Sequence, residues 1–184
     1  MRKMMPIGPL MIEHRLIERM ILVINEEIKK IDKESSIKSG FIETVVDFIR
    51  TYADRCHHGK EEDILFRELK KKNISSENLK IMEELTEEHV WGRKTTAELV
   101  SVYDRYRGGD ETRLGEIQTL LRNLADFYPR HIEKEDKHFF LPVMEYFSQE
   151  ERDRMLQEGF EFDQRLIHEK YRSIVETAEK ITVT

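Results

Sequence analysis

The chain has 184 residues, a single cysteine and a net charge of -6, and 37% of its residues are charged. A chain of this length buries about 70% of the surface that its unfolded form exposes, so one domain without stabilising disulfides is the simplest organisation. Acids and bases mingle throughout, which is typical of solvent-facing helices and speaks against a nucleic-acid partner. Cys56 alone excludes an internal disulfide, and no stretch is apolar enough for a signal peptide or a bilayer span. We therefore expect a cytoplasmic protein with no membrane contact.

Apolar residues recur at intervals of three and four along the whole chain, without the alternation of a strand. The pattern predicts an all-α protein with five helical segments, at about residues 8–31, 41–72, 77–107, 111–147 and 148–181. We expect residues 1–147 to form an up-down-up-down four-helix bundle. Residues 148–184 are expected to form an additional C-terminal fifth helix packed on the same domain. The apolar stripe of this fifth helix suits either capping of the bundle or pairing with another chain.

Two stretches of the chain, residues 57–66 and residues 131–140, share the pattern His-x-x-Lys-Glu-acid-x-x-apolar-Phe. Residues four apart lie above one another on a helix face. Each stretch therefore presents an imidazole and a carboxylate to one point, from the pairs His57 with Glu61 and His131 with Glu135. The same α-helical spacing assigns His58 to a polar face, where we expect it to point to solvent.

His14 and His89 interrupt the apolar faces of the first and third segments. If consecutive helices are antiparallel, residues at one height are equally distant from the turn between them. The midpoints of positions 14 and 57, 57 and 89, and 89 and 131 are 35.5, 73 and 110, and all three lie in expected turns. The sequence therefore predicts four inward histidines in one layer of the bundle, one from each helix.

This layer is chemically unusual for a helical core. One buried histidine is most simply a hydrogen-bonded core residue, but four imidazoles and two carboxylates in one layer are hard to stabilise, because an uncompensated buried carboxylate costs several kcal/mol. Bound cations offset that cost, and imidazole with carboxylate suits iron, manganese or zinc. The layer therefore predicts a two-metal site, with Glu61 and Glu135 each able to bridge both ions and open positions for a small ligand.

These residues resemble the hemerythrin-like family, also called the HHE cation-binding family. Its pattern is a His on the first helix, His-x-x-x-Glu on the second, His on the third, and His-x-x-x-Glu or His-x-x-x-x-Asp on the fourth. The resemblance covers about residues 8–145. It implies a hemerythrin-like four-helix bundle with a non-haem di-iron centre, two iron ions bridged by Glu61 and Glu135. Asp136 occupies the aspartate position of the oxygen carriers, but Glu135 is preferred because it repeats Glu61.

The chain departs from the oxygen carriers on the third helix. Those members have His-x-x-x-His, and the second position is Arg93 in this chain. A four-His, two-Glu site is more similar to the repair and sensor branches. His168, on the fifth helix, is level with the layer because the midpoint of positions 131 and 168 is 149.5. We therefore include His168 among the candidate metal ligands, with a supporting or a surface role as the alternatives.

Three functions remain open at this stage. The first is binding or sensing of a small ligand, oxygen or nitric oxide, at the di-iron centre. The second is a di-iron enzyme or iron donor that reduces peroxide or nitric oxide or repairs iron centres, which the absent fifth histidine favours. The third is a helical interaction module whose polar layer is only structural. Metal identity, oligomeric state and any protein partner are not fixed by the sequence.

Overall fold

The computed structural model describes residues 4–182 of the chain, and their side chains as far as residue 175. Within these residues the chain forms helices and turns without strands, which confirms the all-α prediction. None of the described helices is long and apolar enough to cross a membrane. The elements are α1 (Ile7–Glu34), α2 (Phe41–Phe48), η1 (Ile49–His58), η2 (Glu61–Phe66), α3 (Arg67–Leu69), α4 (Ser76–Arg107), η3 (Glu111–Arg113), α5 (Leu114–Lys134), η4 (Glu135–Phe139), α6 (Phe140–Met144) and α7 (Gln149–Thr182).

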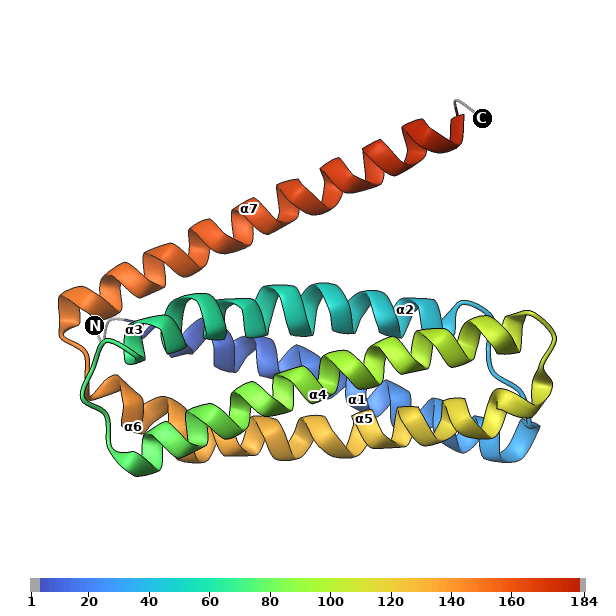
Figure 1. Cartoon of the computed structure of the whole chain (residues 1–184), viewed down its shortest axis with the longest axis horizontal. Helices are drawn as coiled ribbons and strands as arrows, with labels where there is room; N and C mark the ends of the chain where they lie inside the picture. The colour runs from blue at the N-terminus through green and yellow to red at the C-terminus, as the bar shows by residue number, and fades with distance from the viewer. Residues whose placement is uncertain (1–3, 183–184) are drawn as a thin grey trace.

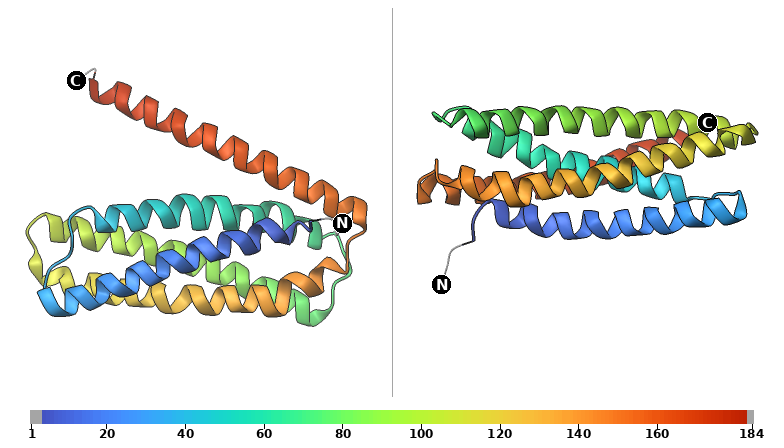
Figure 2. Two further views of the ribbon diagram at one scale, coloured as in Figure 1. Left: turned by 180° about the vertical axis from the view of Figure 1, so that it is seen from behind. Right: turned by 90° about the horizontal axis from the view of Figure 1, so that it is seen from below.

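Four helical columns run antiparallel to one another (Figures 1 and 2). They are α1, the continuous run from α2 to α3, α4, and the run from α5 to α6. Their ends carry the expected capping chemistry: the Ser75 hydroxyl accepts from the Asn78 amide at 3.2 Å, and Gly109 adopts a φ of 102° in the turn after α4. Ser148 and Glu151 form a capping box before α7, with reciprocal bonds of 2.9 and 3.2 Å.

Two hydrophobic clusters fill the bundle, one toward each end. Along α1, Leu10 belongs to one cluster and Ile17 to the other. Along α4, Leu85 and Leu99 divide in the same way. The buried histidines, with Glu61 and Glu135, lie between these two clusters, so the apolar core encloses this polar layer on both sides.

The second and fourth columns are not α-helical throughout. η1, η2 and η4 are π-helical, so their backbone hydrogen bonds close over five residues instead of four and the turn is wider. These segments contain most of the first repeated stretch, residues 57–66, and the second half of the other, residues 131–140. The wider turn is also visible in burial, because Ile64, Leu65 and Phe66 are three consecutive residues that are all buried. An ideal α-helix would bury them less evenly.

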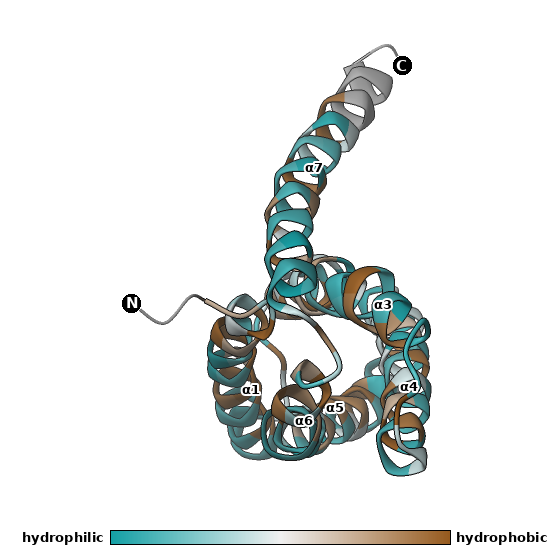
Figure 3. Ribbon diagram, turned by 90° about the vertical axis from the view of Figure 1, so that its left-hand side faces the viewer, coloured by the Kyte–Doolittle hydropathy of each residue, from teal (hydrophilic) through white to brown (hydrophobic). Residues whose placement is uncertain are grey.

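The fifth helix, α7, begins beside the bundle and then diverges from it (Figures 1 and 3). Met155 and Leu166 are buried against the bundle, and Lys170 pairs with Asp47 at 2.9 Å. At Gly59 the approach is close, because an added Cβ would lie 2.8 Å from the ring of Phe162. A larger residue at that position would require the Phe162 ring to shift.

Candidate metal centre

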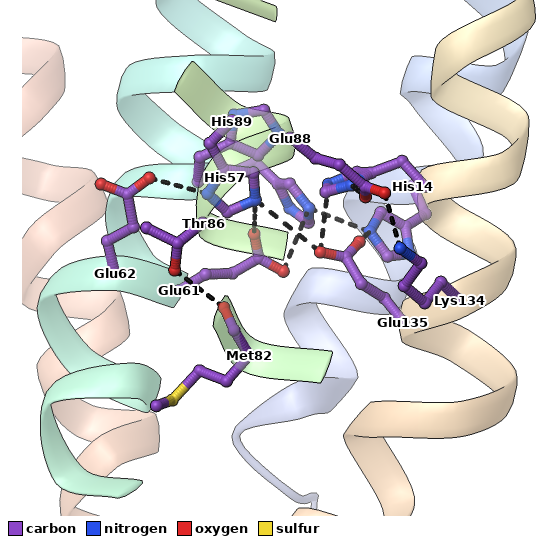
Figure 4. A network of polar contacts seen from close by, with 12 residues as sticks. His14, His57, Glu61, Glu62, Met82, Thr86, Glu88, His89, Lys134 and Glu135 are labelled. Atoms are coloured by element: carbon purple, nitrogen blue, oxygen red, sulfur yellow. Dashed lines mark hydrogen bonds and ion pairs between the residues drawn. The ribbon is translucent and has the colours of Figure 1, made fainter. Parts of the chain in front are cut away.

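The six residues predicted to form one layer lie together in the structure. His14, from α1, and His89, from α4, have no solvent exposure, and neither do the carboxylates of Glu61 and Glu135. His57 and His131 are at most 2% exposed. Figure 4 shows the labelled members of this set, His14, His57, Glu61, His89 and Glu135, converging from all four columns of the bundle. The heights expected from antiparallel helices are therefore correct for the four predicted histidines.

Each of the two carboxylates directs one oxygen toward one pair of histidines and its other oxygen toward the other pair. Glu135 places Oε2 at 3.0 Å from His14 Nε2 and Oε1 at 3.1 Å from His131 Nε2. Glu61 places Oε1 at 3.6 Å from His57 Nε2 and Oε2 at 3.3 Å from His89 Nε2. One side of the layer thus contains His14 and His57, and the other contains His89 and His131. Both carboxylates face both sides.

His58 was expected to face solvent, and that prediction is wrong. Its side chain is 2% exposed, and its ring stacks on that of His89 with centroids 3.9 Å apart. The ring is also 5.4 Å from that of His131 in an edge contact. The structure therefore groups His58 with Glu61, His89 and His131, while His14, His57, Glu61 and Glu135 form the second group with metal-binding spacing.

The π-helical turn explains why both neighbouring histidines point inward. In an α-helix, consecutive side chains diverge by about 100°, which places His58 outside when His57 is inside. The wider turn of η1 reduces this angle and brings both rings into the layer. Two signals in the sequence were available, the doubled histidine and the run of three apolar residues at positions 64–66, because both break an α-helical register.

Four further carboxylates hold the outer nitrogens of the rings, a role that the sequence did not reveal. Each accepts from, or pairs with, the Nδ1 atom of one histidine. The pairs are Asp136 with His14 at 2.8 Å, Glu13 with His57 at 2.9 Å, Glu62 with His89 at 2.7 Å and Glu88 with His131 at 2.7 Å. In every pair, Nδ1 faces the carboxylate and Nε2 faces the layer, which is the arrangement that orients histidine for metal binding.

These four pairs form a closed circuit around the bundle. Every carboxylate neighbours a layer residue in sequence but contacts the histidine of another column. Glu13 of the first column contacts the histidine of the second, and Glu62 of the second contacts that of the third. Glu88 of the third column contacts the histidine of the fourth, and Asp136 of the fourth contacts that of the first. The pattern explains a signal that the sequence contains, an acid directly beside His14, Glu61, His89 and Glu135.

The electrostatics of the layer favour positive charge. Burial by itself lowers the pKa of a histidine, but hydrogen bonds to Asp136 and Glu135 outweigh it and raise the pKa of His14 to about 10. Burial is likewise outweighed at His89, where Glu135, Glu61 and Glu62 raise the pKa to about 11. Burial raises the pKa of Glu135, yet the nearby charge and hydrogen bond of His131 hold it well below its usual range. The Glu135 carboxylate thus remains charged and requires cations beside it.

His58 behaves in the opposite way. Burial, followed by the charges of His89 and His131, lowers its pKa well below the ordinary value. Asp54 is the nearest acid to its Nδ1 atom, at 3.4 Å, and neither ring nitrogen has a hydrogen-bond partner among the described residues. A neutral imidazole, with a free lone pair on its unprotonated nitrogen, is the form in which histidine binds metal.

Several buried polar atoms indicate that metal ions fit this layer. Both oxygens of Glu61 and of Glu135, and Nε2 of His89 and of His131, approach other polar atoms of the layer within 4 Å, but none of them has a hydrogen bond of good geometry among the described residues. Nε2 of His14 and Nε2 of His57 are 2.9 Å apart. Two nitrogens bound at right angles to one ion, each about 2.1 Å from it, lie about 3 Å apart, so this spacing suits a shared cation. Nitrogen and carboxylate donors of this mixture bind transition metals.

His168 and Arg93 lie outside these groups. The side chain of His168 is exposed on α7, and the structure does not bring it to either group. Arg93, at the position of the carriers' additional histidine, pairs instead with Asp54 and Glu62, both at 2.8 Å. A pocket of about 90 Å³ lies beside this arginine and ends on His58, Thr96 and Tyr128. The fifth histidine of the layer therefore comes from η1 and not from α4 or α7.

Comparison with protein families supplies the deciding observation. The family model described as the Hemerythrin HHE cation binding domain matches residues 5–143, about three quarters of the chain. The chain belongs to the hemerythrin family. Comparison with curated proteins and with solved structures gave no match. Membership of the hemerythrin family fits the helical bundle and the buried His and Glu groups, and it identifies the chain as a cation-binding domain with an α-helical extension, α7.

Proposed function

We propose that this hemerythrin-family domain holds two iron ions and uses them to bind or sense a small ligand such as oxygen or nitric oxide. His14 and His57 would bind one ion. His58, His89 and His131 would bind the other, and Glu61 and Glu135 would bridge the two. When bound, such a centre supplies redox-active metal and coordination positions for a diatomic molecule.

The observation that carries this proposal is the orientation of the two carboxylates. A carboxylate that serves one ion has no reason to direct its two oxygens at different histidine pairs. Here both Glu61 and Glu135 do so, with all four nitrogen to oxygen distances between 3.0 and 3.6 Å. This double arrangement supports two ions in preference to one.

The division of the histidines supports ligand binding at one side. The group with His14 and His57 has two imidazoles, whereas the group with His58 has three. With both carboxylates shared, the first side has one protein donor fewer and more room for an exogenous ligand. His14 and His57 are buried below apolar side chains, including Phe140, whose ring stacks on His14 at 5.6 Å. This environment excludes water and suits a small, weakly polar ligand.

The placement of His58 also bears on the enzyme alternative. That alternative was favoured because the third helix lacks a second histidine. A fifth imidazole in the layer removes this reason. The layer then has as many histidines as the oxygen-carrying pattern, although one of them comes from a different helix. Binding or sensing is therefore the proposal that the geometry supports best.

The proposal is tested by loading the metal-free protein with ferrous iron without oxygen, counting iron per chain, and recording optical spectra after adding oxygen or nitric oxide. We expect two irons and an absorption band that appears with the ligand and disappears on its removal. Consumption of ligand beyond stoichiometry would support the enzyme alternative. Equal stability with and without metal, and no binding of iron, would leave a structural polar layer only.

A further inference from the structure

An apolar stripe runs along α7 beside the face that contacts the bundle, and only its first residue, Phe160, also lines the pocket between α7 and the bundle. Its side chains are exposed: Phe160 at 46%, Ile167 at 57%, Tyr171 at 64% and Ile174 at 50%. By contrast, Met155, Leu166 and the ring of Phe162 contact the bundle from the adjoining face of the same helix. The helix therefore has two apolar sides, and the bundle covers one.

The stripe has the spacing of a helix that pairs with another helix. Phe160, Gln164, Ile167, Tyr171 and Ile174 follow at intervals of four, three, four and three. This alternation keeps one seam of a helix facing a partner over several turns. A helix that only caps its own bundle needs apolar residues on one side, so the second seam requires a separate explanation.

The charges beside the seam favour an antiparallel partner of the same sequence. Before Ile167 the helix carries Glu158, Glu161, Asp163 and Arg165, and after it Glu169, Lys170 and Arg172, so acids predominate in the first half of the seam and bases in the second. Glu158, Asp163, Glu169 and Lys170 pair with the bundle, which leaves Glu161 and Arg172 among the charges available to a partner. Parallel pairing of two copies places like charges together, whereas antiparallel pairing places acids against bases. Glu161 and Arg172 lie on one flank of the seam. Within the described part of the chain, neither of them forms an ion pair with the bundle.

We propose that α7 pairs with α7 of a second copy of this chain, antiparallel and about a two-fold axis at Ile167. This residue is the midpoint of the seam from Phe160 to Ile174. Phe160 of one copy is then level with Ile174 of the other, and Glu161 faces the region of Arg172. A two-fold contact is self-complementary and closes after two chains. The end-on view shows α7 standing clear of the four helices, so a second bundle can be accommodated beside it (Figure 3).

The oligomeric state of the full-length protein tests the proposal. Sedimentation velocity over a range of concentrations should give a dimer for the wild type. Ile167→Glu places a charge at the centre of the seam and should raise the dissociation constant of the dimer at least about tenfold. The matched control is Leu22→Glu on α1, because Leu22 is 65% exposed but lies outside α7. It should leave the dimer unchanged. Circular dichroism of both variants checks that the bundle is folded.

Cysteine cross-linking tests the direction of pairing. In Ile167→Cys the two thiols meet at the two-fold axis and should form an intermolecular disulfide on mild oxidation. In Phe160→Cys they lie about 21 Å apart along the axis, too far for a disulfide. The wild type, which retains Cys56, gives the background. A monomeric wild type, a dimer that survives Ile167→Glu, or equal cross-linking of both variants would overturn the proposal.

Discussion

The five imidazoles of the layer differ in how their outer nitrogens are held. Four of them meet a carboxylate at 2.7 to 2.9 Å, whereas His58 has Asp54 at 3.4 Å. His58 therefore enters the layer through backbone geometry and ring stacking. Its role can be separated experimentally from that of the other four, because no carboxylate of the circuit depends on it.

Replacing His58 by Ala should weaken the binding of the metal ion on the side of His89 and His131. Loss of an orienting group alone costs about 10- to 100-fold in metal affinity, so loss of a direct ligand should cost about 100-fold or more. A competition titration against a chelator measures both affinities, with His168→Ala as the control that retains both. Unchanged binding in His58→Ala would show that His58 is not a ligand.

Glu88→Gln tests the carboxylate circuit. Glutamine keeps the size of the side chain but removes the charge that faces His131 Nδ1 at 2.7 Å. We expect metal affinity to fall by about 10- to 100-fold. The control is Glu84→Gln, because Glu84 pairs with Lys134 at 3.2 Å in the same region. If both variants bind metal equally well, the circuit does not support the site.

Helix boundaries and heights followed from the sequence, but the π-helical segments did not. α4 was expected at residues 77–107 and spans Ser76–Arg107, because apolar spacing and capping residues fix such ends. A prediction from apolar spacing assumes one helical period along the whole helix. A local widening of the turn changes the face on which the following residues lie, and no single residue type marks where it occurs. This is why His57 was assigned to the inside while His58 was missed, although the two are adjacent.

The junction between η1 and α7 depends on one glycine. An added Cβ at Gly59 would lie 2.8 Å from the ring of Phe162. Gly59→Ala should lower the free energy of unfolding by about 1 kcal/mol, because overpacking against the half-buried ring of Phe162 outweighs the better helix propensity of alanine. Chemical denaturation measures this loss. In the background of Phe162→Ala the same substitution should instead raise the free energy of unfolding by about 0.5–1 kcal/mol, because only the propensity gain remains. An equal loss in both backgrounds would exclude this contact as the cause.

For the bundle as a whole, the polar layer places buried charges that need compensation between two hydrophobic clusters. Without metal, protons on the histidines balance Glu61 and Glu135, as the raised pKa values of His14, His89 and His131 indicate. Bound cations would replace those protons. Folding, protonation and metal binding are therefore linked in this chain.

This linkage gives the metal-free protein a defined pH dependence. The pKa values of His14, His89 and His131 rise from 6.5 to about 10, 11 and 9, because contacts with acids outweigh the effect of burial. A raised pKa stabilises the folded state fully below pH 6.5, and this contribution is lost as the pH rises through about 9 to 11. The melting temperature of the metal-free protein should therefore fall between pH 7 and pH 10. A constant or rising value would contradict these shifts.

The central claim is that two metal ions lie side by side in this layer, bridged by Glu61 and Glu135. The most direct measurement is a crystal structure of iron-loaded protein with anomalous difference maps recorded at the iron edge. We predict two peaks within the layer, one beside His14 and His57 and the other beside His58, His89 and His131. A single peak, or two peaks with His58 turned away from both, would contradict the account.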